Sequence, residues 1–133
     1  MSNELLRGCP TCGTRVADTD MGLRDYRWVA DALPGRVAPM DLDCVLEKNG
    51  NVLILEFKPK GMALPLGQRL TLKAFVKKPN TRVWVVWEDP SHKHAEVGEM
   101  DVYGNVNFIE RVTIAKLRSK VSTWFTMASQ SDR

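Results

Sequence analysis

The feature that most constrains the fold is a pair of strand-like segments joined by Asn49-Gly50. Residues 42–48 and 51–58 are rich in aliphatic and β-branched side chains. An Asn-Gly pair between two such segments is the strongest short-range signal for a two-residue β-hairpin turn. In such a hairpin, residues whose numbers add up to 99 lie opposite each other, so the turn alone predicts the register of the two strands.

The two faces of this predicted hairpin differ in chemistry, because successive side chains of a strand point to opposite faces. The face expected to enter the core carries Leu42, Cys44, Leu46, Leu53, Leu55 and Phe57. The other face carries Asp41, Asp43, Val45, Glu56 and Lys58. The register puts Asp43 directly opposite Glu56, and like charges so placed destabilise a sheet.

A divalent cation would remove this repulsion. Mg²⁺ is bound through oxygen atoms, often by one or two carboxylates together with water and substrate phosphate. We therefore predict that Asp43 and Glu56 bind Mg²⁺ (or Mn²⁺), and that Lys58 orients an attacking water. The alternative is a solvated sheet face on which Lys58 neutralises Asp41 as an ordinary cross-strand pair.

The remaining segments predict an α/β fold, a small mixed sheet flanked by helices. A helix capped by Asp20 ends at Pro34-Gly35, and a second covers residues 68–78. A third is capped by Thr113, and its inward-facing residues are expected to be Ile114, Leu117, Val121, Trp124 and Phe125. Residues 81–88 are apolar on both faces, which is typical of an interior strand. Residues 89–99 are expected to form a polar loop and residues 102–109 a short hairpin. The 133 residues predict one domain, with residues 1–18 as an N-terminal appendage and 129–133 as a tail.

These spacings resemble the PD-(D/E)xK nuclease superfamily. Asp43 is followed thirteen residues later by Glu56-Phe57-Lys58, and Gln68 stands at the start of the next helix, as in the recombination-type and phage exonuclease branches. The resemblance implies a restriction-endonuclease-like core of helix, three strands, helix and strand, in which residues 36–40 supply the first strand. The family's Pro-Asp dipeptide is absent, so either Asp41 or Asp43 could be the first ligand; the register favours Asp43.

The resemblance implies hydrolysis of phosphodiester bonds in DNA, directed by DNA structure or ends and serving recombination or repair. Lys58 would assist the attacking water or stabilise transition-state charge, and Gln68 would help to orient the site. Arg69, Lys60 and Lys73 are candidates for phosphate contacts, although a solvated helix face shows the same pattern. The formal charge of +3 permits a nucleic-acid partner without requiring one.

Cys9-Pro10-Thr11-Cys12-Gly13 is typical of a zinc-ribbon knuckle, in which a tight turn presents two thiolates to Zn²⁺. A structural zinc site takes four ligands. The other two could come from His92 and His94, or from a second knuckle in a homodimer; a knuckle without metal is the third alternative. A zinc knuckle also defines the alternative function, a non-catalytic nucleic-acid or protein-binding module on the same fold.

Other features narrow the class of protein. Three cysteines are an odd number, which argues against a disulfide framework and favours a reduced, cytoplasmic protein. No apolar segment approaches the ~18 residues that a membrane span needs, so no membrane partner is expected. The tryptophans stand at apolar positions of the predicted elements, which favours core packing over base stacking; they are Trp28, Trp84, Trp87 and Trp124.

Overall fold

The computed structural model describes residues 27–35 and 39–130, and the chain divides into two units, residues 1–40 and 41–133. In the first unit, α1 (Arg27–Asp31) is followed by a turn that reaches Gly35 at φ 66°, a backbone conformation that glycine adopts without strain. The earlier part of the predicted first helix lies outside the described residues. So do residues 36–38 of the predicted first strand, and Pro39 and Met40 are not in a strand.

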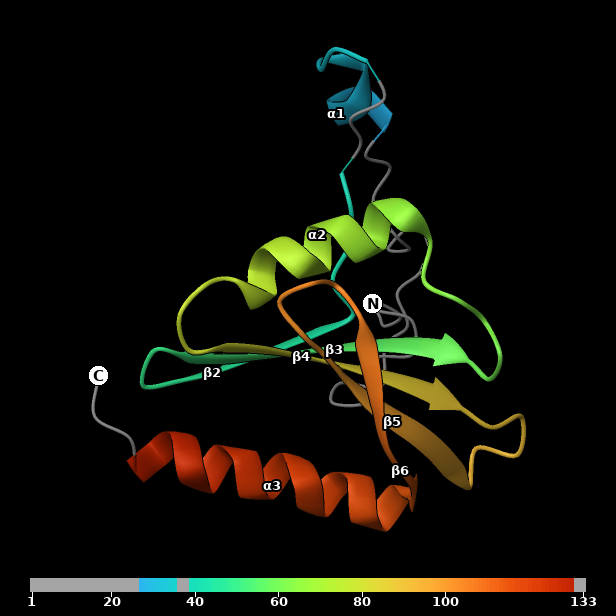
Figure 1. The fold of residues 1–133 in the computed structure, drawn as a ribbon, viewed down its shortest axis with the longest axis vertical. Helices are drawn as coiled ribbons and strands as arrows, with labels where there is room; N and C mark the ends of the chain where they lie inside the picture. Colours follow the sequence, from blue (N-terminus) through green and yellow to red (C-terminus); the bar gives the residue numbers. More distant parts are fainter. Residues whose placement is uncertain (1–26, 36–38, 131–133) are drawn as a thin grey trace, which may run out of the picture. The chain divides into compact units, whose positions relative to one another are not determined.

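A five-stranded mixed sheet forms the centre of the second unit, in the order β2-β3-β4-β5-β6 (Figure 1). The strands are β2 (Cys44–Lys48), β3 (Asn51–Pro59), β4 (Thr81–Glu88), β5 (His94–Met100) and β6 (Val106–Thr113). β3 and β4 are parallel, whereas the other neighbouring pairs are antiparallel. Parallel neighbours need a crossover connection, which α2 (Leu66–Val76) provides.

The sheet is covered by α2 on one side and by α3 (Ile114–Gln130) on the other (Figure 1). The side of α3 holds a continuous apolar cluster, formed by Leu53, Leu55, Trp84, Val86, Ala95, Val97, Val112, Trp124 and Ala128. On the side of α2, Leu72 is fully buried. The predicted α/β architecture, a mixed sheet flanked by helices, is therefore confirmed. Among the described helices, none combines the length and apolar character needed to cross a membrane.

The predicted hairpin register is confirmed. The partners run from Cys44 opposite Leu55 to Lys48 opposite Asn51, and every pair adds up to 99. Asn49 and Gly50 have φ values of 54° and 81°, as a turn with two left-handed central residues requires. The interior strand over residues 81–88 is also confirmed as β4.

The polar loop predicted for residues 89–99 is wrong, because most of that segment belongs to β5. Ala95, Val97 and Met100 are buried, and the charged residues between them point to the other face or to the sheet surface, as expected for a strand. The short hairpin predicted for residues 102–109 is the end of a longer β5–β6 hairpin. Its turn is held by Asp101, whose Oδ1 accepts hydrogen bonds from the backbone N–H groups of Tyr103 and Asn105 at 2.9 and 3.0 Å.

The predicted cap of α3 is confirmed, but the predicted orientation of two of its apolar side chains is wrong. Thr113 caps α3 as predicted, because its Oγ1 accepts a hydrogen bond from the backbone N–H of Lys116 at 3.1 Å. Ile114 and Phe125 do not face inward, however, and their exposed fractions are 43% and 48%. A helix presents only one stripe to a sheet, and here that stripe comprises Leu117, Val121, Trp124 and Ala128.

The tryptophans divide into two groups. Trp84 and Trp124 are buried in the core, as predicted. Trp28 in α1 is 68% exposed, and Trp87 near the end of β4 is only partly buried. Core packing therefore accounts for two of the four.

Candidate active site

Glu56 is the most deeply buried acid among the described residues, with only 2% of its surface exposed. It stands in β3, which has β2 on one side and β4 on the other, so the side chain cannot reach solvent at a sheet edge. Strand alternation directs it away from the apolar cluster under α3 and toward α2. An acid at such a position requires partners, because transfer of a charge out of water is costly.

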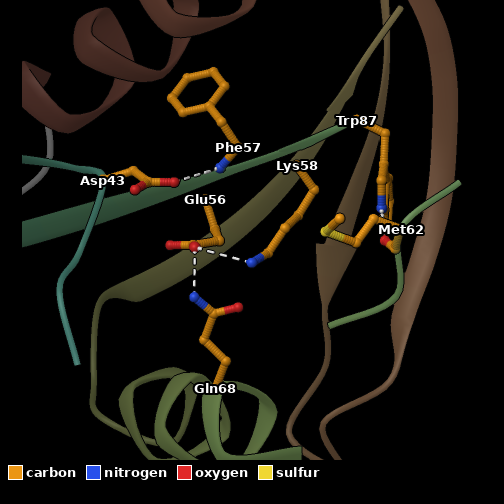
Figure 2. A network of polar contacts seen from close by, with 7 residues as sticks. All are labelled: Asp43, Glu56, Phe57, Lys58, Met62, Gln68 and Trp87. Atoms are coloured by element: carbon orange, nitrogen blue, oxygen red, sulfur yellow. Dashed lines mark hydrogen bonds and ion pairs between the residues drawn. The ribbon is translucent and has the colours of Figure 1, made fainter. Parts of the chain in front are cut away.

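The partners of Glu56 come from separate segments of the chain (Figure 2). Gln68, in the first turn of α2, donates a hydrogen bond from Nε2 to Glu56 Oε2 at 2.7 Å. Lys58, two residues further along β3, places Nζ 3.8 Å from the same oxygen. Asp43, directly before β2, accepts a hydrogen bond on Oδ2 from the backbone N–H of Phe57 at 2.9 Å. We call Asp43, Glu56, Lys58 and Gln68 the Glu56 cluster.

The electrostatics of the cluster raise the pKa of Glu56. Burial is the largest cause, and the negative charge of Asp43 is the second. Lys58 acts in the opposite direction and does not cancel them. A hydrogen bond that the protonated Glu56 would share with Asp43 raises the pKa further. Two carboxylates in this relation stay close at low cost only when one of them is protonated or a cation lies between them.

Two oxygen atoms of the cluster are buried without a hydrogen-bond partner among the described residues, Glu56 Oε1 and Gln68 Oε1. Buried polar atoms of this kind are normally paired. Both atoms are acceptors, and they belong to side chains that already contact each other through Gln68 Nε2 and Glu56 Oε2. The missing partner therefore has to be a donor or a cation.

This donor set fits Mg²⁺. The ion prefers oxygen ligands, and one or two carboxylates commonly suffice because water and substrate phosphates complete the shell. Within the described ranges, no group of three or more His, Cys, Asp and Glu side chains converges on a common point. The protein would accordingly contribute the carboxylates of Asp43 and Glu56, with the amide oxygen of Gln68 beside them.

The structure brings together the four residues predicted from the hairpin and the Gln-bearing helix. Asp43 contacts the backbone next to Glu56 and influences its pKa, which supports the choice of Asp43 over Asp41. The sequence predicted these positions because the Asn-Gly turn fixes the register of β2 and β3. It did not predict the depth of burial of Glu56, which depends on α2.

The predicted phosphate-contacting residues have partners elsewhere. Arg69 donates from Nη1 to the backbone oxygen of Gly104 at 3.1 Å. The side chain of Lys73 lies against the same glycine: a Cβ added to Gly104 would be 3.2 Å from Cδ of Lys73. Arg69 and Lys73 thus lie at the β5–β6 turn, next to α2. Lys60 places Nζ 3.7 Å from Asp89 Oδ1.

Asp89 is a buried acid that the sequence analysis missed. It is 8% exposed and accepts a hydrogen bond on Oδ2 from Arg111 at 2.8 Å. This hydrogen bond is the main cause that lowers the pKa of Asp89. The only signal in the sequence is its position directly after the apolar strand β4. Because Arg111 and Lys60 supply cations from other segments, the group is best explained as a tie between β4 and β6.

The predicted zinc ligands divide between described and undescribed parts of the chain. Cys9 and Cys12 lie outside the described residues. His92 is exposed in a turn at φ 60°, and His94 begins β5, where its backbone oxygen accepts a hydrogen bond from the N–H of Asp89 at 3.1 Å. The knuckle stays a prediction.

Comparisons of the chain with protein-family models, with curated proteins and with solved structures found no match. The functional interpretation therefore rests on the residues of the Glu56 cluster themselves.

Proposed function

We propose that the protein is a Mg²⁺-dependent nuclease that hydrolyses phosphodiester bonds of DNA, on a restriction-endonuclease-like core of the PD-(D/E)xK type. The observation that carries the proposal is the buried carboxylate of Glu56. It gathers Asp43, Lys58 and Gln68 around it and still leaves two buried oxygens without partners. Acids with pKa values perturbed by burial and by a second acid are concentrated at functional sites.

A purely structural role explains the cluster less well. A buried ion pair stabilises a fold only when geometry and further hydrogen bonds offset its desolvation. Here Lys58 is 3.8 Å from Glu56, and the pKa of Glu56 remains raised, so the pair does not offset the burial. An aliphatic residue at position 56 would serve the fold better. The retained charge points to a ligand.

Each member of the cluster has a defined chemical role in this proposal. Asp43 and Glu56 would hold the cation, which when bound lowers the pKa of an attacking water and neutralises charge on the phosphate. Gln68 fixes Glu56 through Oε2, which keeps Oε1 available for the cation. Lys58, whose side chain is 13% exposed, reaches both the cluster and the solvent side. It is placed to hold the attacking water or to stabilise negative charge on the phosphate.

Several finer points belong to the same proposal. We infer that cleavage is directed by DNA structure or DNA ends in recombination or repair, that a homodimer would help to span a branched substrate, and that the protein acts in the cytoplasm. Lys60, Arg69 and Lys73 stay proposed phosphate contacts. Lys60 is exposed and Lys73 only partly buried, and Arg69 has guanidinium N–H groups besides the Nη1 that donates to Gly104.

The experiment is a cleavage assay with matched variants. Plasmid, linear duplex, single-stranded and branched DNA are incubated with the protein in Mg²⁺, in Mn²⁺ and in EDTA. Lys58→Met should lower the cleavage rate about 100-fold or more, as expected for loss of a group that stabilises transition-state charge. Lys93→Met, at an exposed loop lysine, is the control and should cleave like wild type.

A second pair of variants tests the metal ligand. Asp43→Asn should abolish cleavage, whereas Asp41→Asn should not, because Asp43 is the acid that affects the pKa of Glu56. The proposal is wrong if wild type cleaves none of the four DNA forms, or if Lys58→Met cleaves as fast as wild type. DNA binding without cleavage would favour the alternative of a non-catalytic binding module.

A further inference from the structure

A groove of about 360 Å³ opens beside the Glu56 cluster. It is lined by Gly61, Met62, Ala63, Trp87, Glu96, Val106 and Phe108. Trp87 pairs with Lys58 across the parallel strands β3 and β4, so both side chains project from the same face of the sheet. Figure 2 shows the Lys58 side chain between the carboxylate of Glu56 on one side and the side chains of Met62 and Trp87 on the other. The groove therefore lies next to the proposed active site, on the same face of the sheet.

The groove has a preformed aromatic floor. The indole Nε1 of Trp87 donates a hydrogen bond to the backbone oxygen of Met62 at 2.8 Å, which fixes the orientation of the ring. Gly98 lies beside this ring, and its lack of a Cβ leaves space for the neighbouring side chains. A Cβ at that position would lie 2.7 Å from Val106 Cγ1 and 3.4 Å from Trp87 Cζ3. The absence of a side chain at Gly98 therefore leaves room for both Val106 and the Trp87 ring.

Phe108 forms the outer wall of the groove. It stands on β6, the edge strand, and is 63% exposed. A large apolar side chain at an edge gains little for the fold, because it buries little surface. Beside a rigid indole, however, it offers a second ring against which a planar ligand can stack.

The charge of the groove indicates which planar ligand fits. Its lining residues include one charged side chain, Glu96, which is only partly exposed. A carboxylate repels phosphate, but it accepts hydrogen bonds from the exocyclic amino groups of nucleobases. Lys58 places a cationic group on the side of the Glu56 cluster, whereas Lys60 and Arg111 are paired with Asp89. The groove would therefore take a neutral ring, and Lys58 would take a phosphate.

We propose that this groove is a nucleobase subsite, which receives an unpaired base of the DNA strand whose phosphate lies at Lys58. This inference rests on the proposed nuclease function. A base within a duplex is stacked on its neighbours and paired along its edge, so it cannot enter the groove. Single-stranded DNA and frayed DNA ends become the preferred substrates. Base–aromatic stacking of this kind tolerates many sequences, because every base has a flat face.

The test is a binding measurement made in EDTA, so that it does not depend on cleavage. Fluorescence anisotropy of a labelled single-stranded oligonucleotide is compared with that of a blunt duplex of the same sequence. Phe108→Ala should weaken single-strand binding by about 5-fold or more, the usual effect of removing one stacking ring. Phe108→Trp should retain it. Phe125→Ala, at a 48% exposed phenylalanine of α3 on the other side of the sheet, is the matched control and should bind like wild type.

The outcomes separate this inference from the proposed function. If the nuclease assay shows Mg²⁺-dependent cleavage but Phe108→Ala binds single strands as tightly as wild type, the subsite is wrong and the nuclease proposal stands. A groove that accommodates a protein segment instead gives this same result. If Phe108→Ala and Phe125→Ala weaken binding equally, the effect is not specific to the groove, which also overturns the subsite. If Phe108→Ala weakens single-strand binding while Phe108→Trp and Phe125→Ala do not, the nucleobase subsite is supported, even if no cleavage is found.

Discussion

Replacement of Glu56 with glutamine should stabilise the protein at neutral pH while it removes the proposed activity. Glu56 is 2% exposed, and its pKa is raised first by burial and then by Asp43. A carboxyl group with a higher pKa in the folded than in the unfolded state lowers stability wherever it is ionised in the fold. Glutamine has nearly the same shape, keeps an acceptor oxygen and removes the charge.

The size of the expected change in the free energy of unfolding follows from the opposing electrostatic contributions at Glu56. The attraction between Glu56 and Lys58 at 3.8 Å is about 4 kcal/mol at an effective dielectric constant of ~20. The pKa of Glu56 is nevertheless raised, so burial and the repulsion from Asp43 together exceed this attraction. We expect Glu56→Gln to increase the free energy of unfolding at pH 7 by about 0.5–2 kcal/mol, as is common for a relieved functional site. The corresponding rise in Tm is roughly 2–8 °C.

The assay is urea unfolding of wild type and Glu56→Gln in EDTA at several pH values. The increase in the free energy of unfolding caused by Glu56→Gln should reach its full size above the raised pKa of Glu56. It should shrink as the pH falls through that value and vanish below the ordinary 4.5, where the carboxyl is protonated in both states. Glu47→Gln, at an exposed glutamate of β2, is the control; glutamine keeps an acceptor oxygen for the N–H of Gly50, so stability should change by no more than about 0.5 kcal/mol.

Magnesium adds a second readout to the same experiment. An ion that binds only the folded state stabilises it, by about 2.7 kcal/mol at 100 times its Kd. Mg²⁺ should therefore stabilise wild type more than Glu56→Gln. The reasoning is refuted if Glu56→Gln is less stable than wild type at pH 7 in EDTA, because the charge of Glu56 would then be net stabilising.

Three further predictions concern other parts of the chain. Asp89→Asn should destabilise the fold at neutral pH, because the pKa of Asp89 is lowered by Arg111; in urea unfolding the loss should disappear as the pH falls through the lowered pKa, below the ordinary 3.8. Thr113→Ala should cost about 0.5–2 kcal/mol in unfolding free energy through loss of the α3 cap, whereas Thr113→Ser should not. Zinc measured by elemental analysis should be bound by wild type and lost in Cys9→Ser; wild-type protein without zinc would remove the knuckle hypothesis.

The sequence predicted those parts of the site that follow from local pattern. The Asn49-Gly50 turn fixes which residues of β2 and β3 face each other, so it placed Asp43 beside Glu56 without knowledge of the rest of the fold. Helical periodicity predicted the helix that carries Gln68, whereas a role for Gln68 in the site was implied by the resemblance to the PD-(D/E)xK superfamily. The turn and the periodicity act over a few residues, and local interactions are enough to establish them.

The groove and the β5 strand could not be predicted in the same way. β5 alternates buried Ala95 and Val97 with polar residues, which is the period of a strand, but the alternating run is short and directly follows the polar segment 89–94. Its register with β6 shifts at Val97/Gly98, which no local pattern indicates. Trp87 has an apolar neighbourhood in the sequence, yet its exposure depends on Gly98 and Met62, which reach it only in the folded chain.

The two faces of the sheet divide stability and chemistry between them. The face under α3 holds the continuous apolar cluster, whereas the face under α2 carries Glu56, Lys58 and the rim of the groove. Since burial of apolar surface is the main stabilising contribution, the first face can offset the cost of an ionised acid on the second. A cavity made under α3, as in Val97→Ala, should therefore lower stability without a change in single-strand binding. Phe108→Ala should weaken single-strand binding without a change in stability. Both results together are expected if one face of the sheet stabilises the fold and the other binds the ligand.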